Sequence, residues 1–102
     1  MAATVLKASA QVTVAVSGTE QPIVAAAVER VVALYLSAPA GNTGVIYVGD
    51  STVTTTKGYG IEKGLSFKIE APEGNYIDIA QIYVDAGTGG DKVNVSYLQL
   101  TN

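Results

Sequence analysis

Alternation of apolar and polar residues with a period of two dominates this chain. Near the N-terminus, apolar side chains occupy every second position from Leu6 to Val16, and polar residues separate most of them. Such a period places successive side chains on opposite faces of a strand, so we expect one strand face to turn toward a core. The expected inward set is Leu6, Ala8, Ala10, Val12, Val14 and Val16.

Residues 65–71 alternate in the same way and predict a second half-buried strand. Leu65, Phe67, Ile69 and Ala71 are expected to point inward, while the polar residues between them face solvent. Turn residues separate this strand from its neighbours. Further strands are predicted over Val45 to Val48, Ile79 to Asp85 and Lys92 to Leu100, with a long loop from Gly49 to Gly60.

The segment from Ile23 to Leu36 supports two interpretations. Its first half contains good helix formers, with Pro22 available as a first helical residue and Thr19 as a cap. Its second half is β-branched and aromatic, which favours a strand. We favour an extended link followed by a strand over Val28 to Leu36.

Six to eight short strands with turns every 8–12 residues predict an all-β fold. We expect a single domain over residues 1–102, an antiparallel β-sandwich or a jelly-roll-like barrel. Residues 1–5 are apolar and free of turn signals, and we expect them to form an extended N-terminal arm.

Composition excludes several classes of function. The chain has no histidine and no cysteine, so the usual ligands of zinc, haem and copper are missing and no cofactor is expected. The net charge is −3, and a nucleic-acid-binding protein needs a basic face that neutralises phosphates, so nucleic-acid binding is not expected. No stretch approaches the roughly 18 apolar residues of a membrane span, and no secretion signal is visible. We therefore expect a protein made in the cytoplasm that binds neither nucleic acid nor membrane.

Two motifs suggest chemistry that their surroundings do not support. Ser51, in the run Gly49-Asp50-Ser51, follows a predicted strand like the nucleophile of some ester hydrolases, but no histidine is present to accept its proton. The segment from Asp85 to Asp91 places glycines where a calcium loop needs acidic ligands. We expect a turn at each position and no enzymatic activity.

The loop from Thr52 to Gly60 is a candidate contact surface. Its threonines can bind a partner through hydrogen bonds, and Tyr59 between two glycines is a plausible exposed anchor. In the alternative interpretation the loop folds over one end of the sandwich and Val53 fills the core. The residues predicted to contact a partner, from this loop and the arm, are Ala2, Ala3, Thr4, Val5, Val53, Lys57 and Tyr59.

Four elements in order resemble a group of small virion proteins of tailed bacteriophages. The resemblance covers about three-quarters of the chain, from Pro22 to Leu98. It rests on Val28 to Leu34 with its internal Arg30, Tyr47 to Thr54, Ile61 to Phe67, and the terminal pair Ile82 to Asp85 and Val93 to Tyr97.

The resemblance implies a non-enzymatic part of a phage particle, most simply a decoration or cement protein on the capsid exterior. The implied partners are the major capsid protein and further copies of this chain, in a dimer or trimer. Two alternatives stay open. One is a low-copy neck, collar or tail component, and the other is a module that binds a host surface or a glycan.

Overall fold

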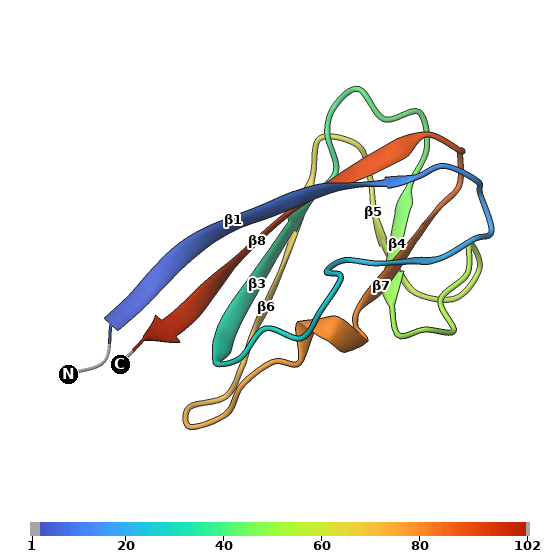
Figure 1. Cartoon of the computed structure of the whole chain (residues 1–102). Coiled ribbons are helices and arrows are strands. Elements are labelled where there is room, and N and C mark those ends of the chain that lie inside the picture. Colours follow the sequence, from blue (N-terminus) through green and yellow to red (C-terminus); the bar gives the residue numbers. More distant parts are fainter. Residues whose placement is uncertain (1–2, 102) are drawn as a thin grey trace.

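The computed structural model describes residues 3–101, which form two four-stranded antiparallel sheets packed as a sandwich (Figure 1). The predicted all-β sandwich is confirmed. The first sheet has the order β1 (Ala3–Val14), β8 (Asp91–Thr101), β3 (Val31–Ser37), β6 (Ser66–Glu70). The second has the order β2 (Gln21–Pro22), β7 (Tyr83–Ala86), β4 (Ile46–Gly49), β5 (Tyr59–Ile61), and a single 3₁₀ turn, η1 (Ile79–Gln81), precedes β7.

The core lies between the two sheets and is built from the alternating residues of their central strands. β8 contributes Val93 and Val95, and β3 contributes Leu34 and Leu36, all buried. Because side chains alternate along each strand, the residues between them face outward. The remaining core includes Val14, Ile23, Val31, Ile46, Val48, Ile61, Ile79, Val84 and Ala86.

β1 and β8 are the two longest strands, and the end of the ribbon that they form extends beyond the sandwich (Figure 1). Their pairing runs from Ala3 opposite Thr101 to Val14 opposite Asp91. A β-bulge interrupts it between Ala8 and Gln11, where three residue steps on β1 oppose two on β8. An extra residue in one strand exchanges the faces on either side of it.

That exchange makes the predicted inward face of β1 wrong in part. Val12 and Val14 lie on the core side, but Leu6 lies on the outer face opposite Leu98 and is 63% exposed. Val16 follows the end of the strand and is 62% exposed. The alternation is continuous in the sequence, but the bulge places the apolar residues before it on the outer face and those after it on the core face.

Residues 23–30 form neither a helix nor a strand. Ile23 is buried and its backbone N–H donates to the carbonyl of Ile82 at 3.1 Å, while Val24 and Val28 pack against the core. Arg30 has a φ of 62°, an uncommon value for a residue other than glycine, which separates this link from β3. The helical alternative was therefore wrong, and the strand begins at Val31 rather than at Val28.

Other boundaries also differ from prediction. The expected strand from Ile79 begins as a 3₁₀ turn capped by Asp78, whose carboxylate accepts the N–H of Ala80 at 3.2 Å. Leu65 precedes β6 and is exposed, although Phe67 and Ile69 pack against the core as expected. The predicted loop from Gly49 to Gly60 contains the beginning of a short strand, β5.

Candidate interaction surface

Among residues 3–101 no group of three or more acidic side chains is placed to hold a metal ion. Within the same residues, no helix is long and apolar enough to cross a membrane.

Ser51 is exposed at a turn, and its neighbour Asp50 accepts hydrogen bonds from the backbone N–H and the hydroxyl of Thr52 at 2.9 and 2.5 Å. The bond from the Thr52 hydroxyl is the main reason that the pKa of Asp50 lies below its ordinary value of 3.8. The Asp50 carboxylate thus organises the turn.

The two aspartates that flank the glycine-rich turn hold backbone groups. The buried Asp91 accepts the N–H of Thr43 at 2.8 Å with one oxygen and that of Gly44 at 2.7 Å with the other. Asn42, also buried, continues this contact by exchanging two hydrogen bonds with the backbone of Lys92, at 2.7 and 2.9 Å. Together these four bonds fasten the 39–45 loop to the start of β8.

Asp85 is fully buried on β7. One of its carboxylate oxygens accepts the N–H of Gly18 at 3.0 Å and that of Ala86 at 2.8 Å. Among the described residues, its second oxygen has no hydrogen-bond partner. The side chain anchors the turn after β1 onto the second sheet.

For one of the residues predicted to contact a partner, Val53, the prediction is wrong. It is 2% exposed, and its side chain packs beside Gly49 and Gly58, so its methyl groups offer no surface to another molecule. The backbone N–H of Val53 donates to the carbonyl of Asp50 at 3.0 Å and closes the turn that precedes it. For this residue the alternative interpretation, a loop that folds over the sandwich end, is correct.

Lys57 and Tyr59 are exposed beside that loop. The Nζ of Lys57 donates to the hydroxyl of Thr52 at 3.1 Å. Tyr59 is 59% exposed, and its ring lies against Phe67 with centroids 4.6 Å apart and planes tilted by 36°. Contact with Phe67 fixes the ring while leaving most of it open to a partner.

The predicted N-terminal contact residues lie in β1, apart from Ala2, which lies outside the described residues. Ala3, Thr4 and Val5 pair with Thr101, Leu100 and Gln99 of β8 and are exposed. They therefore form the end of a ribbon and not an unpaired arm. The other edge of β1 is open, because β1 is the outermost strand of its sheet.

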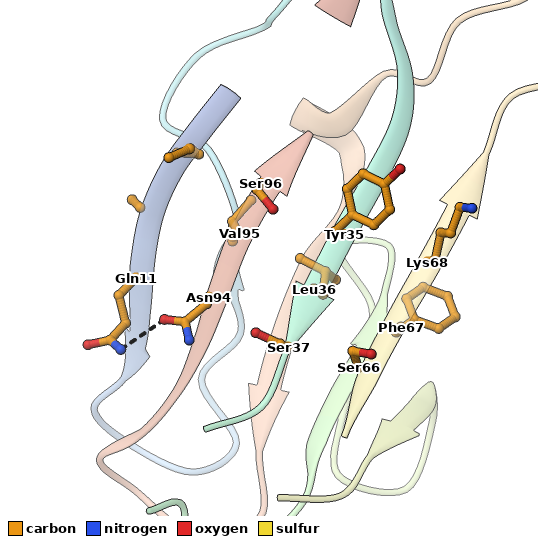
Figure 2. Close-up of a pocket in the computed structure, with 13 residues that line it drawn as sticks. Gln11, Tyr35, Leu36, Ser37, Ser66, Phe67, Lys68, Asn94, Val95 and Ser96 are labelled. Carbon is orange, nitrogen blue, oxygen red and sulfur yellow. Dashed lines mark hydrogen bonds between the residues drawn. The ribbon is translucent and has the colours of Figure 1, made fainter. Parts of the chain in front are cut away.

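A shallow groove of about 500 Å³ crosses the outer face of the first sheet (Figure 2). Gln11 and Asn94 lie at one side, where the Nε2 of Gln11 donates to the Oδ1 of Asn94 at 2.9 Å. At the other side, the Nζ of Lys68 is 5.8 Å from the centre of the Tyr35 ring. The rest of the lining includes the small residues Ala8, Ser37, Ser66 and Ser96.

Sequence reasoning missed both the groove and the bonds that Asn42 and Asp91 make between the 39–45 loop and the start of β8. Each depends on residues brought together by strand pairing over long separations, such as Gln11 with Asn94. Comparison with known protein families, curated proteins and solved structures finds no match to this chain.

Proposed function

We propose that this chain is a structural protein of a bacteriophage particle, a decoration protein that binds the outside of the capsid and stabilises the shell. The observation that carries the proposal is the open edge of the projecting β1–β8 ribbon. Nearly all of β1 is exposed, including Val5 and Leu6. An uncovered strand of this length offers main-chain hydrogen bonds and apolar side chains to another chain, which suits an assembly protein.

The exposed surfaces support attachment at more than one place. In Figure 1 the loop of residues 50–58 lies on the opposite side of the molecule from the free end of the ribbon, along a molecule 44 Å in its longest extent. A protein with separate surfaces for its own copies and for the shell binds through several weak contacts at once. Such contacts together give firm attachment even where each one is weak.

Tyr59 is the side chain that we propose for shell contact, with Lys57 beside it. A large, fixed, exposed aromatic ring is the kind of residue that dominates protein interfaces. This assignment keeps two of the sequence-predicted contact residues and leaves out the buried Val53.

The test is binding of the purified protein to particles that lack it, measured by co-sedimentation. Tyr59→Ala should weaken binding at least tenfold. Tyr76→Ala is the control and should not weaken it, because Tyr76 is similarly exposed but lies on the 72–78 loop, outside the proposed shell contact. Thermal unfolding of both variants checks that loss of the Phe67 contact has not unfolded the domain. Unchanged binding by the Tyr59 variant would remove this residue from the shell contact.

The groove of Figure 2 favours a glycan-binding module as a second candidate. It combines an aromatic ring, Tyr35, with the amides of Gln11 and Asn94 and with serine hydroxyls, groups that can bind sugar hydroxyls. Screening against a panel of immobilised glycans tests it. A hit that Tyr35→Ala and Asn94→Ala abolish would support this candidate, and a panel without hits would count against it.

A further inference from the structure

The open edge of β1 differs from the other three sheet edges. β6 carries the Lys68–Glu70 ion pair, β2 has two residues of which one is Pro22, and β5 has three residues including Gly60. Short length, charges and proline are features that prevent edge strands from pairing with other chains. β1 has 12 residues and a single charged one, Lys7.

Only the first part of β1 is regular enough to accept another strand. Its pairing with β8 is uninterrupted from Ala3 to Ala8, and the bulge follows. Beyond that point the 21–28 segment borders β1 at Ser9, Ala10 and Val12. Leu6 lies near the middle of the regular stretch, exposed on the outer face beside the half-buried Leu98.

We propose that two copies of this chain pair through antiparallel β1 strands around a twofold axis at Leu6. The two first sheets would then merge into one continuous eight-stranded sheet. This inference deepens the proposed function by naming one partner, a second copy, and it requires no phage particle for its test. Identical subunits most commonly associate through such a self-complementary contact.

Symmetry and side-chain chemistry select the register. A twofold axis perpendicular to the sheet keeps outer faces together, so each outward residue must oppose another outward residue. Centring on Leu6 places the two leucines against each other and Lys7 opposite Val5 of the second copy. Centring on Lys7 sets two like charges opposite each other, which is unfavourable. Centring on Val5 leaves Leu6 against Thr4.

The proposed register accounts for the exposure of Leu6. In the pair, the Leu6 and Leu98 side chains of both copies would form one apolar row across the new strand boundary. Cross-strand apolar pairs stabilise antiparallel sheets, and burial removes the leucines from water.

A charge-exchange experiment tests the twofold axis directly. The wild-type protein should sediment as a dimer. Leu6→Glu and Leu6→Lys should each sediment as monomers, because two like charges would oppose each other, and an equimolar mixture of the two should recover the dimer. Val16→Glu is the matched control, since Val16 is equally exposed but lies outside β1, and it should stay dimeric. A monomeric or trimeric wild-type protein would overturn the pairing.

Single cysteine substitutions test the register without introducing a charge at the pairing edge. The chain contains no cysteine, so each variant carries one thiol. Directly opposite Cβ atoms in antiparallel strands lie about 4.5–5.5 Å apart, close to the range that a disulfide spans. Leu6→Cys should cross-link on mild oxidation at least tenfold faster than Val5→Cys, Lys7→Cys or the control Val16→Cys. Faster cross-linking at position 5 or 7 would overturn the register.

The two proposals fail separately. Sedimentation and cross-linking measure the pairing of purified protein, whatever particle it belongs to. A dimer that is absent from phage particles would refute the decoration role alone, and a monomer present on particles would refute the pairing alone.

Discussion

Removing the carboxylate of Asp91 should destabilise the domain more than removing that of Asp50 or Asp78, which are both exposed. Asp91 is buried, and each of its oxygens accepts one backbone N–H from the 39–45 loop, at 2.8 and 2.7 Å. In Asp91→Ala both N–H groups lose their partner. The loop then loses its attachment to the start of β8 at this point.

The expected magnitude follows from the number and the environment of these bonds. A hydrogen bond to a charged group contributes about 1.5–3 kcal/mol when buried. Thr43 is exposed and Gly44 half-buried, so water can replace part of the loss. We therefore expect Asp91→Ala to lower the free energy of unfolding by about 2–4 kcal/mol. For a domain of this size, that corresponds to a fall in Tm of roughly 10–25 °C.

The assay is urea unfolding followed by circular dichroism, with Asp78→Ala as the matched control. Asp78 is also an aspartate that accepts a backbone N–H, but it is exposed and its bond measures 3.2 Å. The control should lose no more than about 1 kcal/mol. Asp91→Asn, which keeps one acceptor oxygen, should fall between the two. A loss below about 0.5 kcal/mol in Asp91→Ala would refute the argument that these bonds hold the loop.

Three further predictions concern the loop between β4 and β5. Val53→Ala should cost about 1–3 kcal/mol in urea unfolding, because Val53 is buried and its removed methyl groups leave a cavity; a neutral result would contradict its placement. Gly58→Ala should destabilise the domain, because Gly58 has a φ of 149° and a new Cβ would lie 2.7 Å from a Val53 methyl, whereas Gly41→Ala meets nothing within 4 Å and should be nearly neutral. In an NMR titration Asp50 should show a midpoint below 3.8, so its hydrogen bonds persist at neutral pH and are lost as the pH falls through that lowered pKa; a midpoint above 3.8 would contradict the geometry.

Local patterns in the sequence predicted the parts of the fold that depend on neighbouring residues. The predicted strand from Lys92 to Leu100 lies within β8, and the alternation of Phe67 and Ile69 correctly predicts the core-facing side of β6.

One error arises where a distant partner changes the meaning of a local pattern. The alternation that includes Leu6 and Val12 is regular, yet the bulge opposite β8 turns these two residues to different faces. A second error has a local cause: Val28 to Arg30 was predicted as the start of a strand, but the positive φ of Arg30 delays the strand to Val31.

Contact residues were harder to predict than strands. Tyr59 is exposed as expected, because glycines flank it in an edge strand, while Val53 in the same loop is buried. The sequence separation between Asn42 and Lys92 is 50 residues, and nothing near either residue indicates that they bond. The open edge of β1 emerges only from the order of strands in the sheet.

The number of copies of this chain per particle tests the central claim most directly. Phage particles would be purified from the source that encodes this chain. Quantitative mass spectrometry of these particles would give the ratio of this chain to the major capsid protein. The decoration role predicts a simple whole-number ratio to the shell protein. Absence of the chain from the particles would contradict the claim, and a few copies per particle would instead assign it to the neck or tail.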